Sequence, residues 1–251
     1  MTETLAITNQ KGGVGKTTTC VNLAASLTRL GKRVLVIDMD PQGNATTGSG
    51  ADKHADGPTS CELLLGQASL ADSARRVDAG FDLVPANGDL TVAEVRLMEE
   101  PRREYRLRDA LATAPEPYDH VLIDCPPSLN LLTVNGLVAA DGVVIPMQCE
   151  YYALEGLTAL MRTIESIQRG PNPNLRIAGL LRTMFDPRNR LSGDVSEQLT
   201  GHFGERVFRT VIPRNIRLAE APSFGQPALL YDASSRGAVA YLALAGEMLR
   251  R

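Results

Sequence analysis

A glycine-rich segment near the start of the chain constrains the fold more than any other feature. It reads Lys11-Gly12-Gly13-Val14-Gly15-Lys16-Thr17-Thr18, between the apolar run Leu5–Thr8 and an alanine- and leucine-rich stretch over residues 16–30. A glycine-rich turn between a strand and a helix lets backbone N–H groups converge on an anion at the positive end of the helix dipole. The sequence therefore predicts a phosphate-binding loop, in which Lys16 reaches the β- and γ-phosphates and the Thr17 hydroxyl binds Mg²⁺.

The loop departs from the general phosphate-loop pattern, G-x-x-x-x-G-K-[ST], at its head. Gly15, Lys16 and Thr17 match the end of the pattern, but Gln10 stands where the first glycine is expected and a second lysine, Lys11, opens the loop. The chain has 26 lysines and arginines together, of which only four are lysines, and two of these four lie in the loop. This concentration favours an anionic ligand over a surface turn that carries lysines by chance.

Short apolar runs alternate with helical stretches along the rest of the chain. The predicted strands are Leu5–Thr8, Val34–Asp38, Phe81–Val84, His120–Asp124, Gly142–Pro146, Arg176–Met184 and Val207–Ile212. Such continuous Val, Ile and Leu runs are typical of parallel strands that are buried on both faces. Predicted helices include residues 16–30, which end at Gly31, Ala153–Arg169, which ends at Gly170, and one that opens with a capping box at Thr59–Glu62. We therefore expect an α/β fold of the P-loop NTPase type, a mostly parallel twisted sheet flanked by helices on both faces, as one domain over residues 1–251.

Two predicted strands end in an acid. Val121-Leu122-Ile123 leads to Asp124, and Val34–Ile37 leads to Asp38, with Asp40 two residues further on. An acid at a strand end can also cap a helix or occupy a turn. Because phosphate loops lie at the carboxyl ends of parallel strands, the loop favours a functional role for these carboxylates beside a bound metal.

Composition excludes several classes of protein. No apolar run approaches the roughly 20 residues that span a bilayer. The start of the chain has no basic stretch followed by an apolar core, so we expect no secretory signal. The four cysteines are scattered, with no C-x-x-C pair, which argues against a zinc site or a disulfide framework and fits a reducing cytoplasm.

Positive charge is concentrated in one part of the chain. The net charge of the whole chain is −3. Between Arg176 and Arg217 there are eight arginines, no lysines and four acids, so this segment alone carries +4. Charge alone leaves two explanations open, a surface that binds nucleic acid and solvated arginines without a ligand.

The loop resembles the deviant Walker A motif of the ParA/MinD class of ATPases, and further segments resemble the ParA/Soj partition ATPases in particular. These are Ile7-Thr8-Asn9-Gln10, Asp38-Met39-Asp40-Pro41-Gln42-Gly43-Asn44, Asp124-Cys125-Pro126-Pro127-Ser128, Gln148–Gly156 and Ile212–Ser223. The resemblance spans nearly the whole chain, apart from residues 51–111.

This resemblance implies an ATPase that uses ATP and Mg²⁺. Lys16 and the loop amides of Gly12–Thr18 would hold the phosphates. Thr17 would ligate Mg²⁺, with Asp124 and Asp38 holding it through water. Asp40 would position the attacking water. Lys11 would cross a dimer interface to the partner's phosphates, so that an ATP-dependent homodimer sandwiches two nucleotides.

The resemblance also implies residues for adenine and for DNA. Pro213 and Asn215 would flank the base with Met184 nearby, although residues 212–215 also fit a plain strand-to-helix turn. Arg188 and Arg217 match positions that bind double-stranded DNA non-specifically in relatives, and Arg190 and Arg214 are plausible neighbours. The implied partner is a ParB-type centromere-binding protein, at the nucleoid in the cytoplasm.

Other functions remain open at this stage. Because the phosphate loop begins at Lys11, there is no room before it for the helix-turn-helix domain of some relatives, and we do not expect site-specific operator binding. A MinD-like membrane regulator would need an amphipathic C-terminal helix, whereas residues 241–251 resemble a helix packed on the domain, so we expect no membrane partner. A redox or ligase relative, and a scaffold that binds ATP without hydrolysing it, are further alternatives.

Overall fold

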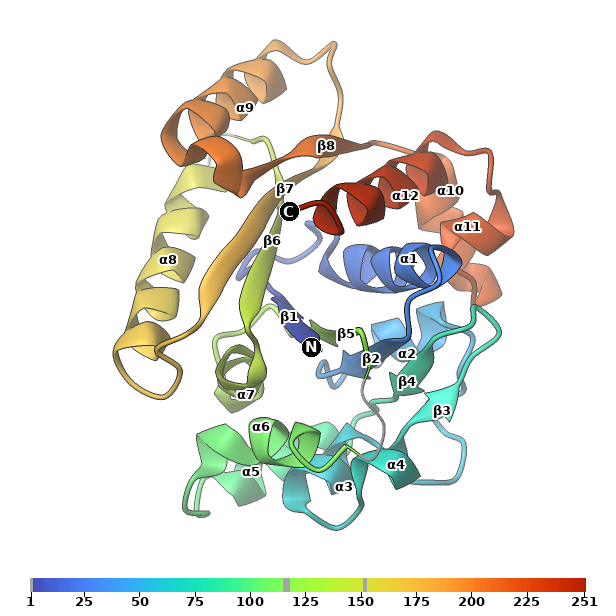
Figure 1. Cartoon of the computed structure of the whole chain (residues 1–251), viewed down its shortest axis with the longest axis vertical. Coiled ribbons are helices and arrows are strands. Elements are labelled where there is room, and N and C mark those ends of the chain that lie inside the picture. The colour runs from blue at the N-terminus through green and yellow to red at the C-terminus, as the bar shows by residue number, and fades with distance from the viewer. Residues whose placement is uncertain (1, 115–117, 151–152) are drawn as a thin grey trace.

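The computed structural model describes residues 2–114, 118–150 and 153–251. An eight-stranded sheet in the order β3-β4-β2-β5-β1-β6-β7-β8 runs through the molecule, as Figure 1 shows. The strands are β1 (Glu3–Ile7), β2 (Val34–Asp38), β3 (Arg75–Arg76), β4 (Asp82–Val84), β5 (His120–Asp124), β6 (Gly142–Gln148), β7 (Arg176–Phe185) and β8 (Val207–Pro213). Every neighbouring pair is parallel except β3 with β4. All seven predicted strands are confirmed, and β3 is an addition.

Helices cover both faces of this sheet, as the fold class predicted (Figure 1). They are α1 (Lys16–Arg29), α2 (Asn44–Gly48), α3 (Ser60–Leu65), α4 (Leu70–Ser73), α5 (Leu90–Leu97), α6 (Arg106–Leu111), α7 (Leu131–Ala139), α8 (Ala153–Arg169), α9 (Arg190–Phe203), α10 (Ile216–Glu220), α11 (Ala228–Tyr231) and α12 (Arg236–Met248). Short 3₁₀ helices lie at Arg103–Tyr105, Gly204–Arg206 (η2) and Ala221–Phe224 (η3). The predicted capping box is present at the start of α3, where Thr59 and Glu62 bond each other's backbone and side chain.

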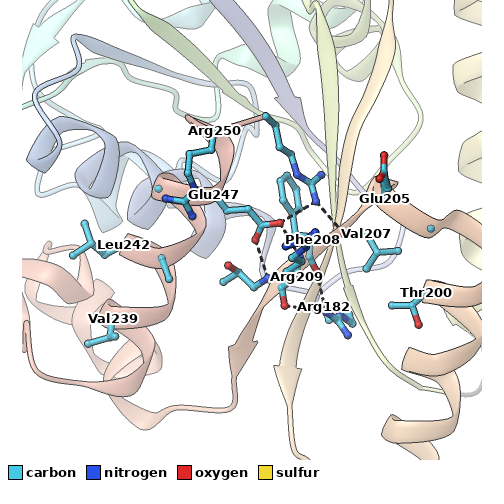
Figure 2. A pocket seen from close by; sticks show the side chains of 15 residues that line it. Arg182, Thr200, Glu205, Val207, Phe208, Arg209, Val239, Leu242, Glu247 and Arg250 are labelled. Atoms are coloured by element: carbon cyan, nitrogen blue, oxygen red, sulfur yellow. Dashed lines mark hydrogen bonds and ion pairs between the residues drawn. The ribbon is translucent and has the colours of Figure 1, made fainter.

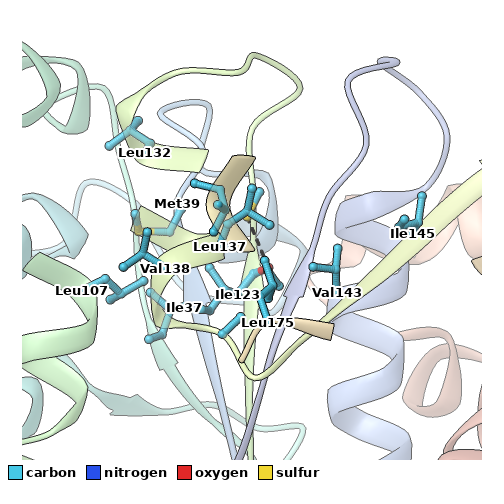
Figure 3. Close-up of a cluster of buried hydrophobic side chains, with 14 of the residues drawn as sticks. Ile37, Met39, Leu107, Ile123, Leu132, Leu137, Val138, Val143, Ile145 and Leu175 are labelled. Atoms are coloured by element: carbon cyan, nitrogen blue, oxygen red, sulfur yellow. Dashed lines mark hydrogen bonds between the residues drawn. The ribbon is translucent and has the colours of Figure 1, made fainter. Parts of the chain in front are cut away.

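Two hydrophobic cores lie on opposite faces of the sheet, because successive side chains of a strand point to opposite faces. Leu5 and Ile7 of β1 join the core beneath α1 and α12, whereas Ala6 between them joins the core beneath α3, α5, α7 and α8. Figure 3 shows part of the second core, where Ile123 lies among residues of α7 and neighbouring strands. Burial on both faces explains why the central strands have continuous apolar sequences.

The C-terminal helix α12 packs on the domain, as its sequence predicted. Tyr241 and Leu244 are buried against α1, and the Tyr241 hydroxyl lies 3.1 Å from the Thr19 hydroxyl in a shared hydrogen bond. Within the described ranges, no helix is long and apolar enough to cross a membrane.

A hollow of about 1430 Å³ lies along the edge strand β8, between α12 and η2 (Figure 2). The β7–β8 ladder changes register here. Arg182 of β7 donates to the carbonyls of Phe208 and Arg209, and the carboxylate of Glu247 on α12 accepts the N–H groups of Arg209 and Thr210. Two charged side chains thus satisfy edge-strand backbone groups that the ladder leaves free, so the polar lining of this hollow is structural.

We expect Glu247→Gln to lower the free energy of unfolding by about 1–3 kcal/mol, because an amide offers one acceptor to two backbone donors. Burial raises the pKa of Glu247, but hydrogen bonds from Thr210 and Arg209 and the Arg251 charge lower it overall. Its contribution is therefore present at neutral pH and is lost as pH falls through this lowered pKa.

Urea denaturation at pH 7 and pH 3 measures this loss. Glu165→Gln on α8 is the control, because its ion pair with Arg169 is exposed and contributes little. Equal effects of the two substitutions would contradict the role of Glu247.

Candidate active site

The predicted phosphate loop lies at the carboxyl ends of the strands and borders a cavity of about 770 Å³. Of the loop, Gly12, Gly13 and Gly15–Thr18 line this cavity. The backbone of Gly13 has φ 73° and that of Gly15 has φ 87°, a left-handed conformation that glycine adopts without strain. Gly15 is the N-cap of α1, so the N-terminus of a buried helix opens into the cavity. This is the geometry of an anion site.

Lys16 is buried at the base of this loop. Its ammonium donates to the carbonyl of Lys11 at 3.1 Å. Burial lowers its pKa, while the carboxylates of Asp124 and Asp40 act in the opposite direction. A bound phosphate would add to the negative charge near this ammonium and would favour its charged form.

Asp38 and Asp124 face each other across the pairing of β2 with β5, and both are fully buried. One oxygen of Asp38 accepts hydrogen bonds from the N–H (2.8 Å) and hydroxyl (2.7 Å) of Thr46 in α2. Neither oxygen of Asp124 has a hydrogen bond within 3.5 Å among the described residues, although the nearby Thr17 hydroxyl and the Lys16 charge both act to lower its pKa. A buried carboxylate with so little compensation is costly when ionised, so the site favours a cation or a proton.

The pKa values of the pair show the same requirement. Burial, followed by the nearby Asp38 charge, raises the pKa of Asp124 well above its usual range. Burial raises the pKa of Asp38 to about 6, although hydrogen bonds from Thr46 oppose this. No group of three or more acidic, histidine or cysteine side chains in the described ranges could hold a metal alone. The pair instead fits Mg²⁺, which binds through one or two carboxylates together with substrate phosphates.

Asp40 lies in a tight turn after β2 and lines the cavity. Its N–H donates to Asp38 at 3.1 Å, and its own carboxylate accepts the N–H of Gln42 at 3.0 Å. The turn therefore fixes the Asp40 carboxylate against the same opening as Lys16.

Lys11 is exposed and does not line the cavity of its own chain. Its ammonium donates to Glu150 at 2.6 Å, and both side chains remain about half exposed. Tyr151 and Tyr152, which belong to the same motif as Glu150, lie outside the described residues.

The residues predicted to bind adenine do not all lie at the same cavity. Met184 lines the cavity, next to Gly15. Pro213 lines a neighbouring hollow instead, and the side chain of Asn215 caps α10 by accepting the N–H of Arg217. Pro222 and Gln226 line the cavity and were not identified from the sequence. Pro222 belongs to the segment Ile212–Ser223, but nothing in that segment marks it as a cavity residue, because the packing of η3 against α2 places it there. No motif contains Gln226.

The four arginines predicted to bind DNA lie just after the carboxyl ends of β7 and β8. The Arg214 N–H donates to the Phe185 carbonyl, which joins the two loops that carry these arginines. Arg188 pairs with Asp186, whose pKa its hydrogen bonds lower to about 2, and Arg217 pairs with Glu220 and Asp232. Arg190 and Arg214 have exposed side chains without an ion-pair partner in the described part of the chain.

The fold and this site define a P-loop ATPase. Residues 2–177 match the family described as AAA domain. The chain is 53% identical to the chromosome partitioning protein ParA of Caulobacter vibrioides, over 98% of this chain and 94% of that protein. It is also 53% identical to the chromosome-partitioning ATPase Soj of Thermus thermophilus, over 98% of this chain and 95% of that protein. The chain belongs to the ParA/Soj family of chromosome-partitioning ATPases.

Solved structures share the fold. A cobyrinic acid a,c-diamide synthase from Mycobacterium smegmatis with bound ATP analog and magnesium has a TM-score of 0.87 and 40% identity, covering 100% of this chain and 95% of that chain. MinD from Pyrococcus horikoshii complexed with Mg-ADP has a TM-score of 0.79 at 24% identity, covering 98% of this chain and 96% of that chain. The second likeness supports the fold alone.

Removal of one carboxylate should stabilise the metal-free protein. The folded state holds protons that the unfolded chain releases, so its free energy of unfolding falls as pH rises from about 4 through about 6. We expect Asp124→Asn to raise this free energy by about 1–2 kcal/mol at pH 8 and by less at pH 5.

Urea denaturation without metal or nucleotide measures this effect. The control is Asp82→Asn, because the Asp82 carboxylate forms a partly exposed ion pair with Arg76. An equal gain at both pH values would show that ionisation of the buried carboxylate is not the cause.

Proposed function

We propose that this protein is an ATP-dependent switch for chromosome or plasmid partition. The observation that carries the proposal is the placement, at the carboxyl ends of the strands, of a phosphate loop, two buried carboxylates and a cluster of arginines. A nucleotide site and a DNA-binding surface would therefore lie on the same side of the sheet. Membership of the ParA/Soj family supports the same assignment.

The proposed reaction is hydrolysis of ATP to ADP and phosphate. Lys16 and the amides of Gly12–Thr18 hold the β- and γ-phosphates, while Thr17, Asp38 and Asp124 hold Mg²⁺. The ion, when bound, neutralises charge between the phosphates. Asp40 lies within the same cavity and orients the attacking water. Solved relatives with an ATP analog or ADP and magnesium support this choice of cofactors.

Lys11 is proposed to act on the phosphates of a second copy of the chain. It lies outside its own cavity, and its ion pair with Glu150 is exposed, so that pair contributes little and can be exchanged. A homodimer formed face to face would let each Lys11 neutralise charge in the opposite site.

Non-specific double-stranded DNA is the proposed ligand of Arg188, Arg190, Arg214 and Arg217. The dimer doubles this surface, which gives a physical reason for binding only in the ATP state. Phosphates would replace the carboxylates that now pair with Arg188 and Arg217. A ParB-type protein would then stimulate hydrolysis and release, at the nucleoid in the cytoplasm.

Two alternatives have less support. A MinD-like regulator would require a free apolar face on the last helix, whereas Tyr241, Leu244 and Ala245 of α12 are buried. A redox relative would require accessible cysteines, whereas Cys20, Cys61, Cys125 and Cys149 are all buried.

The first test is binding to a fluorescent random-sequence duplex with ATP, ADP or no nucleotide. We expect binding with ATP only, regardless of sequence, and a steep loss between low and moderate salt. Lys11→Ala should abolish the ATP-dependent dimer, whereas Asp40→Ala should keep the dimer and the DNA complex but stop hydrolysis. Absence of DNA binding in every state, or binding of liposomes with ATP, would overturn the proposal.

A charge reversal tests which surface meets DNA. Arg217→Glu should weaken binding in the ATP state at least about tenfold and reduce the slope of log affinity against log salt by about one per lost contact. Arg169→Glu makes the same charge change on α8, which Figure 1 places across the molecule from α10, and should have little effect. ATP hydrolysis without DNA checks that both variants fold. Equal losses would show that the arginine cluster is misassigned.

A further inference from the structure

The phosphate loop has few contacts that fix the direction of its peptides. A Cβ atom added at Gly12 or Gly13 would meet no atom within 4 Å, so this half of the loop stands free. At its head, the Asn9 side chain accepts the Lys11 N–H at 3.0 Å and donates to the Pro146 carbonyl of β6 at 2.8 Å. The second half needs a separate anchor.

That anchor is Thr183, near the end of β7. Its hydroxyl donates to the Val14 carbonyl at 2.8 Å, and the side chain is 2% exposed. Its Cβ and Cγ2 atoms also lie 3.9 Å from the position that a Cβ of Gly15 would occupy. One side chain from a distant strand thus bonds the Val14 carbonyl and borders the space beside Gly15.

The backbone of β7 is shaped for this contact. Met184, the next residue, has φ 48°, and in the described ranges Arg102 is the other non-glycine residue with a positive φ. A left-handed residue at a strand end is strained, and such strain persists where surrounding contacts hold it. The bend lets Thr183 reach the loop while Met184 lines the cavity.

The direction of one carbonyl determines the direction of the next N–H. A peptide is planar and trans, so its C=O and N–H point in opposite directions. While Thr183 holds the Val14 carbonyl, the Gly15 N–H is directed away from β7. Glycine accepts either sign of φ, so the same peptide could otherwise turn over and present an oxygen to the phosphates.

We propose that Thr183 is a positioning residue for nucleotide binding, a latch that keeps the Val14–Gly15 peptide from turning over. Without the latch, only a fraction of molecules has the competent loop, and the apparent affinity falls by that fraction. This inference concerns nucleotide binding and does not depend on whether the chain binds DNA.

The test compares Thr183→Val, which keeps the shape and removes the hydroxyl, with Thr183→Ser, which keeps the hydroxyl. We expect Thr183→Val to weaken binding of Mg-ADP, measured by calorimetry, about tenfold. The KM for ATP should rise in parallel while kcat at saturating ATP changes less, because bound nucleotide selects the competent loop. Thr183→Ser should keep near-normal values of all three.

Thr19→Val is the matched control, because it removes another buried threonine hydroxyl bond, on α1, that faces Tyr241 instead of the loop. It should lower the Tm without changing the affinity for Mg-ADP. If Thr183→Val binds Mg-ADP with normal affinity and loses as much Tm as Thr19→Val, the proposed latch is wrong. If Thr183→Val does not fold, Thr183→Cys, whose thiol is a weak donor, replaces it. Affinity equal to that of Thr183→Ser would then contradict the proposal.

Discussion

The burial of two carboxylates side by side is the constraint on which the rest of the site depends. Parallel pairing of β2 with β5 aligns Asp38 with Asp124, and the apolar strands below them exclude water. Thr46 satisfies Asp38, so the unmet requirement for positive charge is concentrated on Asp124. The Lys16 ammonium supplies only part of this positive charge. Burial of these two carboxylates raises the free energy of their ionised forms, and a bound metal–phosphate complex would lower it.

Both hydrophobic cores serve to hold this pair in place. Alternate residues of β1, β2 and β5 anchor the strands from above and below, so the strand ends have little freedom to separate. The glycine loop beside them has little core of its own and depends on neighbours from β6 and β7. The core-anchored strands thus form the rigid part of the site, and the glycine loop forms the part whose backbone can adjust.

Local sequence patterns predicted the strands and most of the candidate site. Runs such as Val34–Asp38 carry their own signal, because burial on both faces demands continuous apolar residues. The two-residue β3 has no such pattern, and only its pairing with β4 defines it. Lys16 and Asp124 stand in motifs, whereas Thr183 meets Val14 across 169 positions of sequence. Contacts of this kind follow from the packing of β7 beside the loop, and no spacing within one segment reveals them.

The treatment of the sheet edges has a consequence for how copies of this chain can associate. At one edge, Arg182 and Glu247 occupy backbone groups of β8, and at the other edge β3 is only two residues long. Unpaired backbone groups on an open edge strand can pair with a strand of another chain, and repeated pairing of this kind produces aggregates. Blunt edges disfavour open-ended association through the sheet. The homodimer proposed above would therefore form through other faces of the molecule.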